Sequence, residues 1–103
     1  MVYGIRYTAM ALEHRRGLSS RDRTTVMDAV DDNLRHQPDV PTRHRKPMRP
    51  NFLAPWELRV GDYRVFHDVE PEADEAEGPE VVILAVGLKI GNQVWIGGEE
   101  HEL

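Results

Sequence analysis

The fold of this chain is decided by residues 56–66, WELRVGDYRVF, near the middle of its 103 residues. The first five alternate apolar and charged side chains, which is the pattern of a strand with one buried face. Residues 61–62, Gly-Asp, favour a tight turn, and a second alternating stretch runs from Tyr63 to Val69. The segment therefore predicts a β-hairpin whose first strand turns Glu57 and Arg59 away from the core.

The C-terminal side of this hairpin contains a second strand signal. Residues 81–86 are continuously apolar and rich in β-branched side chains, which predicts a central strand buried on both faces and ended by Gly87. Residues 93–96 are expected to form a short last strand, and residues 97–103 a frayed tail.

The N-terminal side of the hairpin reads as a strand followed by two helices. Residues 2–7 alternate and favour a strand, and Thr8 is placed to cap a helix from Ala9 to about Arg16. Ser19 begins a capping-box pattern, and an apolar stripe at every fourth residue indicates a second helix over about 21–35.

Because helices come early and strands late, the order predicts one α+β domain spanning residues 1–103. The N-terminal strand and the two-helix hairpin are expected to pack on one face of a mostly antiparallel sheet of about four to five strands. The other face is expected to lie open and to carry the function.

Charge is distributed unevenly over this frame. The net charge is −5, yet nine carboxylates are concentrated in residues 70–80 and in the C-terminal tail. Elsewhere 13 basic side chains stand against 9 acidic ones, which leaves the body of the domain mildly basic. We expect the acidic 70–80 segment to be a mobile loop.

Several classes of protein are not favoured by the composition. The chain has no cysteine, and its five histidines show no metal-ligand spacing, so neither a metal nor another cofactor is expected. No apolar run approaches the length of a membrane span, and the N-terminus lacks the features of a signal peptide. A cytoplasmic protein is therefore expected.

Basic side chains are predicted to converge on the open face of the sheet. One of the two registers of the second hairpin strand places Arg64, Phe66 and Asp68 outward, with Arg64 near Arg59 and with Lys89 on the same rim. The proline-rich loop before the hairpin is also basic, and its RNA-binding candidates are Arg43, Arg45, Lys46 and Arg49. Guanidinium groups bind phosphate oxygens in pairs, and the aromatic ring of Trp95 offers a stacking surface for a base.

Three stretches resemble the RelE/ParE superfamily of bacterial toxins, closer to the RelE branch: residues 46–48 (KPM), 56–66 and 82–89 (VILAVGLK). The resemblance covers most of residues 2–95. It implies a RelE-like toxin domain of a type II toxin-antitoxin system, neutralised by a cognate antitoxin through which it can oligomerise. RelE-like members act in the ribosome as metal-free endoribonucleases, or mRNA interferases, that cut mRNA and so inhibit translation.

The resemblance also implies roles for single residues. Arg64 matches the arginine after the turn that contacts the scissile phosphate, Arg59 matches a basic strand position, and Lys89 matches a basic residue that stabilises the transition state. These three are the catalytic candidates. Trp95 falls where many members have a C-terminal tyrosine.

Three features motivate a second hypothesis. Glu57 stands where the best-known members carry lysine, Trp95 cannot donate or accept a proton as tyrosine might, and the overall charge is acidic. The alternative is a ParE-like inhibitor of DNA gyrase or a RelE-fold binding protein that has lost catalysis. The nuclease hypothesis requires the cations to lie together, unpaired, and it predicts that Arg64→Ala abolishes toxicity and leaves the fold intact.

Overall fold

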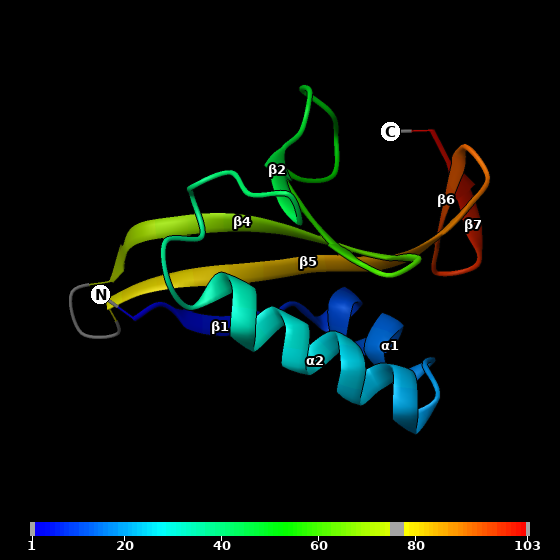
Figure 1. Ribbon diagram of the computed structural model, residues 1–103, viewed down its shortest axis with the longest axis horizontal. Helices are drawn as coiled ribbons and strands as arrows, with labels where there is room; N and C mark the ends of the chain where they lie inside the picture. Colours follow the sequence, from blue (N-terminus) through cyan, green and yellow to red (C-terminus); the bar gives the residue numbers. More distant parts are fainter. Residues whose placement is uncertain (1, 75–77, 103) are drawn as a thin grey trace.

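A computed structural model describes residues 2–74 and 78–102, in which two helices pack on one face of a curved seven-stranded sheet (Figure 1). The α+β class is therefore confirmed, with more strands than the four to five expected. The elements in chain order are β1 (Gly4–Tyr7), α1 (Ala9–Arg16), α2 (Ser20–Leu34), β2 (Arg45–Pro47), β3 (Trp56–Val60), β4 (Tyr63–Asp74), β5 (Gly78–Ile90), β6 (Gln93–Ile96) and β7 (Glu99–His101).

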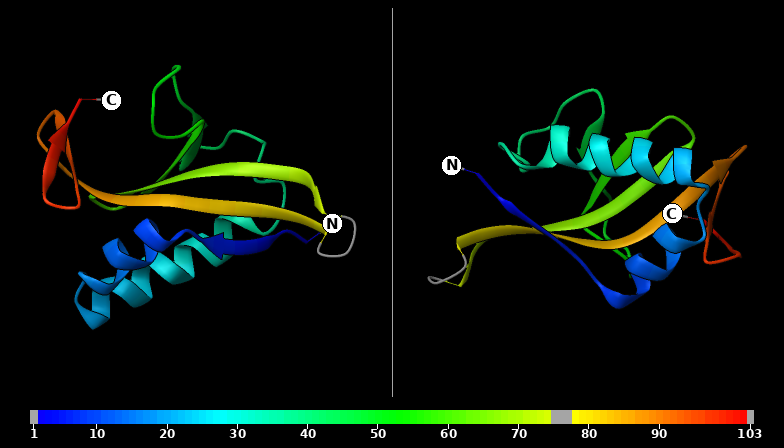
Figure 2. Two further views of the ribbon diagram at one scale, coloured as in Figure 1. Left: turned by 180° about the vertical axis from the view of Figure 1, so that it is seen from behind. Right: turned by 90° about the horizontal axis from the view of Figure 1, so that it is seen from below.

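The sheet is built around β5, as its apolar run predicts. Six strands follow the order β2-β3-β4-β5-β6-β7 with antiparallel neighbours, and β1 pairs with β5 in parallel. Both helices lie on the side of β1, below the long β4–β5 ribbon in Figure 1 and in the left-hand view of Figure 2. Residues far apart in sequence are thus brought onto two distinct faces.

The two helices begin where their caps predict. Thr8 Oγ1 accepts a hydrogen bond from the Ala11 amide, and Ser19 Oγ accepts one from the Asp22 amide, both at 3.1 Å. Each such cap contributes about 1 kcal/mol. The apolar stripe of α2, formed by Val26, Val30 and Leu34, is completely buried against the sheet.

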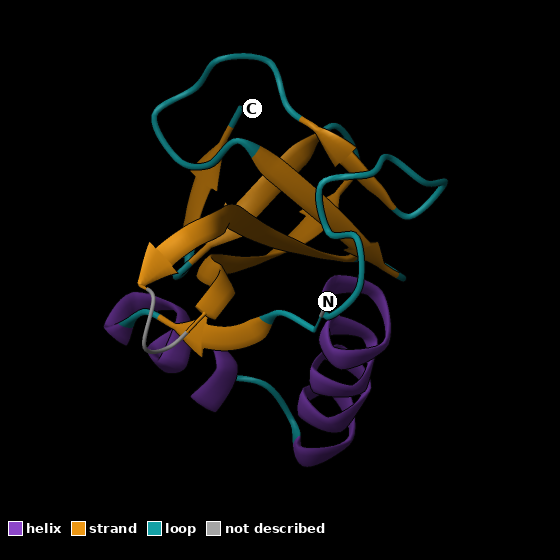
Figure 3. Ribbon diagram, turned by 90° about the vertical axis from the view of Figure 1, so that its left-hand side faces the viewer, coloured by secondary structure: helices purple, strands orange, loops and turns teal. Residues whose placement is uncertain are grey.

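The face away from the helices was expected to lie open. It instead carries a small second core. The loop of residues 48–55 lies on this side of the sheet, where Figure 3 shows a long loop away from the helices. Ala54 of this loop packs with Phe66, Ala85 and Ile96. Asn51 holds the loop in shape, since its Oδ1 accepts from the amides of two following residues and its Nδ2 donates to the Ala54 carbonyl. Only part of this face therefore remains accessible.

The end of β5 departs from the expected strand end at Gly87. The strand continues to Ile90, and Gly87 lies where β6 crosses closely. A Cβ at this position would lie 2.8 Å from Val94 Cγ1 and 3.1 Å from the Trp95 carbonyl oxygen. The glycine is thus required by close packing and does not terminate the strand.

Two further expectations are corrected. Residues 99–101 of the expected frayed tail form β7, which pairs with β6 in register from Val94–His101 to Ile96–Glu99. Most of the expected acidic loop extends the β4–β5 hairpin, because β4 continues to Asp74 and β5 begins at Gly78. Residues 75–77 lie outside the described residues.

Candidate functional site

The strand registers place four cationic side chains on the face away from the helices. Lys46 pairs with Glu57, and Arg59 pairs with Arg64, across neighbouring strands. Arg64 in turn pairs with Gly87, so Lys89, two residues further along β5, is on the same face. We call Lys46, Arg59, Arg64 and Lys89, together with Glu57, the basic face. Of the two registers that the sequence left open for β4, the structure adopts the one that turns Arg64 and Phe66 away from the helices, since Phe66 lies in the core on this side.

The carboxylate of Glu57 lies between the two arginines. Its Oε1 is 3.1 Å from Arg64 Nε and 3.7 Å from Arg59 Nε. Arg64 Nη1 also donates to the carbonyl oxygens of Gly61 and Tyr63, both at 2.8 Å. The residue is only 8% exposed. Arg64 is therefore an internally held arginine, which corrects the expectation of an exposed and unpaired charge.

The other cations of the basic face remain accessible. The Arg59 side chain is 45% exposed and its contact with Glu57 is long. Lys46 and Lys89 are exposed, and neither forms an ion pair with another residue in the described ranges. The strand registers place the four cations on one face, whereas the requirement that they be unpaired fails for Arg64.

A hollow of about 580 Å³ lies beside this face. It is bounded by β2 and the loop that follows, and its lining includes Lys46, Arg49, Phe52, Glu57 and Glu102. The predicted RNA-binding residues Lys46 and Arg49 therefore line the same hollow, together with Glu57. Phe52, which is 78% exposed, supplies an aromatic surface at the same place.

Arg45 does not line this hollow. It pairs with Leu58, which belongs to the helix-side core, and it is 8% exposed. Its Nε donates to the Val40 carbonyl at 2.7 Å and its Nη1 to the Asn33 carbonyl, so that it ties the loop to the end of α2. The expectation of an RNA-binding Arg45 is corrected to a structural position. Arg43 is exposed in the preceding loop.

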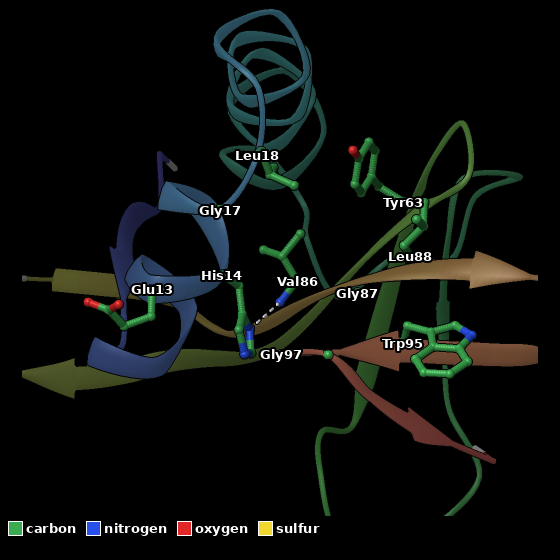
Figure 4. Close-up of a pocket in the computed structure, with 11 residues that line it drawn as sticks. Glu13, His14, Gly17, Leu18, Tyr63, Val86, Gly87, Leu88, Trp95 and Gly97 are labelled. Atoms are coloured by element: carbon green, nitrogen blue, oxygen red, sulfur yellow. Dashed lines mark hydrogen bonds between the residues drawn. The ribbon is translucent and has the colours of Figure 1, made fainter.

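Trp95 also lies away from the basic face. It pairs with Leu88, and both line a pocket of about 510 Å³ on the helix side together with Tyr63 and Leu18 (Figure 4). The alternation of side chains along β6 instead puts Val94 and Ile96 with the second core. Trp95 therefore cannot stack a base held by Arg59 and Lys89 on the opposite face.

His14 borders the same pocket and was not singled out by the sequence. The Val86 amide donates to its Nδ1 at 3.1 Å, a bond drawn as a dashed line in Figure 4. Val86 lies on the edge of β5 between the stretches that pair with β1 and with β6, so the histidine supplies the missing acceptor. Burial lowers the pKa of His14, which favours the neutral ring that this bond requires.

His67 is completely buried in the sheet beside a register shift of β4. Its ring stacks on Trp56 with centroids 6.3 Å apart, and Nδ1 lies 3.0 Å from the Val65 carbonyl oxygen. Burial lowers its pKa to about 4. No group of three or more potential metal ligands occurs in residues 2–74 and 78–102, and no described helix is long and apolar enough to span a membrane.

Comparison with solved structures finds a chain of the toxin-antitoxin complex RelBE2 from Mycobacterium tuberculosis. The two chains superimpose with a TM-score of 0.64 and are 26% identical. The match covers 86% of this chain and 100% of the other. No family model matches the sequence, and no curated protein matches it significantly.

Proposed function

We propose that this protein, whose fold is that of a RelE-type toxin, is the toxin component of a type II toxin-antitoxin system and cleaves mRNA on the ribosome without a metal. The likeness to a chain of a toxin-antitoxin complex supports the toxin and its antitoxin partner. The observation that carries the nuclease proposal is the gathering of Lys46, Arg59, Arg64 and Lys89 on one face.

The proposed reaction is transfer of a phosphoryl group within one RNA strand. The ribose 2′-oxygen bonds to the adjacent phosphorus while the bond from phosphorus to the 5′-oxygen breaks. The 2′-hydroxyl gives its proton to a water molecule, and the leaving 5′-oxygen takes one from a cationic side chain of the basic face. Arg59 and Lys89 stabilise the additional negative charge on the phosphoryl oxygens, and the ammonium groups of Lys46 and Lys89 are proton donors for the leaving oxygen.

The proposed partners follow from the same chemistry. The accessible cations of the basic face and of the loop at Arg43 and Arg49 bind the phosphate backbones of mRNA and ribosomal RNA in the cytoplasm. The cognate antitoxin neutralises the protein. The acidic end of the β4–β5 hairpin, including Glu70 and Glu80, lies outside the proposed RNA contact.

A second candidate function is favoured by one observation, the ion pair between Glu57 and Arg64. While Arg64 is paired with Glu57, its Nε is not free to contact a substrate phosphate. The alternative is a RelE-fold protein that binds its partners and has lost catalysis. A ParE-like effect on DNA gyrase would appear as DNA-damage signalling without mRNA cleavage.

Lys89→Ala and Arg59→Ala are each expected to lower ribosome-dependent mRNA cleavage by about 10²- to 10³-fold, because each removes a charge that stabilises the transition state. The measurement is cleavage of a defined mRNA by purified protein, with and without ribosomes. Trp95→Leu is the matched control: it changes an exposed side chain on the opposite face and is expected to leave the rate unchanged.

Growth of cells that express the soluble wild-type protein without an antitoxin would contradict the toxin proposal. Growth arrest without any mRNA cleavage would contradict the nuclease and leave the gyrase alternative. Equal cleavage rates for wild type, Lys89→Ala and Arg59→Ala would remove the basic face as the catalytic site.

A further inference from the structure

We infer that the carboxylate of Glu57 is an internal ligand of an anion-binding site, and that it occupies the place that a phosphodiester oxygen takes between Arg59 and Arg64. The ligand class rests on the proposed function, since the ligand is an RNA phosphate. The contacts themselves do not depend on it. An RNA strand must displace Glu57 before both arginines can hold it.

The ion pair and the hydrogen bonds of Arg64 show why displacement is required. Its Nε lies 3.1 Å from Glu57 Oε1, and its Nη1 is fully used by the carbonyl oxygens of Gly61 and Tyr63. A carboxylate and a phosphate present similar oxygen pairs to a guanidinium fork, so one anion excludes the other from the same edge. Arg64 is thus oriented for an anion but already occupied by one.

The surroundings of Glu57 indicate that it can leave. Its side chain is 13% exposed and lines the hollow beside β2, where Lys46 and Arg49 offer other cationic neighbours. Its second arginine contact, at 3.7 Å to Arg59, is longer than a hydrogen bond. The carboxylate therefore competes with RNA for Arg64 without being locked in place from every side.

The test compares RNA binding by wild type and Glu57→Gln. The amide keeps the size of the side chain and an acceptor for Arg64 Nε, but it removes the competing charge. A fluorescent single-stranded RNA, followed by anisotropy, is expected to bind the variant about 5- to 30-fold more tightly. The slope of log K against log[salt] is expected to become steeper by about 0.7, the value for one additional phosphate contact on a single strand.

The chain offers a closely matched control. Glu80 forms an ion pair with Arg6 whose Nε–Oε1 distance is also 3.1 Å, and its side chain is 15% exposed, but it lies on the N-terminal half of β5, remote from the basic face. Glu80→Gln makes the same change in net charge and is expected to leave the salt slope unchanged. A gain shared by both variants would show a general charge effect and would overturn the inference.

Unchanged or weaker RNA binding by Glu57→Gln would likewise overturn it. Glu57→Ala, which removes the carboxylate and its hydrogen-bonding atoms, is a second variant expected to act in the same direction. Cleavage assays on the same samples separate the two proposals. If the Glu57 variants bind RNA more tightly and no protein cleaves it, the anion site is supported and the nuclease proposal is contradicted. If wild type cleaves mRNA and both Glu57 variants bind RNA as wild type does, the nuclease proposal is supported and the anion site is contradicted.

Discussion

Arg64→Ala is expected to lower the free energy of unfolding by about 2 to 3 kcal/mol. The substitution leaves the carboxylate of Glu57 without its closest cation, and it leaves the Gly61 and Tyr63 carbonyl oxygens without this donor. Removing one partner of a largely buried pair exposes the desolvation penalty of the other. The measurement is the urea midpoint followed by tryptophan fluorescence. The expected loss of stability revises the earlier expectation that this variant keeps an intact fold. Loss of toxicity in Arg64→Ala alone would therefore not identify Arg64 as a catalytic residue.

Two variants check the assignment of this loss. Arg59→Ala removes the exposed member of the same cross-strand pair and is expected to change stability by less than about 0.5 kcal/mol. The double variant Glu57→Gln/Arg64→Ala is expected to recover part of the loss, because no unpaired carboxylate remains. An unchanged midpoint for Arg64→Ala would show that the ion pair and its carbonyl contacts are absent in solution.

Lowering the pH from 7 to 4 is expected to reduce stability by about 3 kcal/mol through His67 alone. Its pKa in the folded protein is about 4, against 6.5 for an unperturbed histidine, because burial disfavours the charged ring. Between these two values the unfolded chain binds the additional proton. The contribution is thus complete above pH 6.5 and is lost as the pH falls toward 4. His14, whose pKa is also lowered, changes stability in the same direction.

The comparison that isolates this effect is between wild type and His67→Phe, which keeps an aromatic ring against Trp56 but cannot titrate. Urea unfolding at several pH values gives the slope of the free energy of unfolding against pH for each protein. The effects of carboxylates are shared by both proteins and cancel in the difference between the two slopes. His44→Gln alters an exposed histidine and is expected to keep the wild-type slope. Equal slopes for wild type and His67→Phe would place the folded pKa of His67 at its ordinary value.

Local patterns predicted most elements of this fold. The caps at Thr8 and Ser19, the stripe of α2 and the alternation of residues 56–66 each report on neighbours within one or two turns or across one hairpin, so the sequence carries them directly. The strand β7 was missed because Glu99–His101 has no apolar alternation; it forms because β6 presents an edge to which it can pair.

The sequence predicted only part of the candidate site, because local patterns report only on residues that are close in the chain. Alternation left two registers open for Tyr63 to Val69, and one of them placed Arg64 on the face of Arg59 and Lys89. The strand pairing selects that register. Which partners they meet depends on distances across strands, and no local pattern reports that Glu57 lies at 3.1 Å from Arg64. The opposite placement of Trp95 likewise follows from the pairing of β6 with β5.

The sequence by itself determined the α+β class, the helix starts and the central strand, since these follow from periodicity and from caps that act over a few residues. Only the tertiary structure decided which charges are available. Arg45 is buried and its hydrogen bonds stabilise a loop, and Arg64 is paired with Glu57. Lys46, Arg59 and Lys89 remain exposed. Such outcomes depend on which residues distant in the chain come into contact, and that information arises only when the strands have paired.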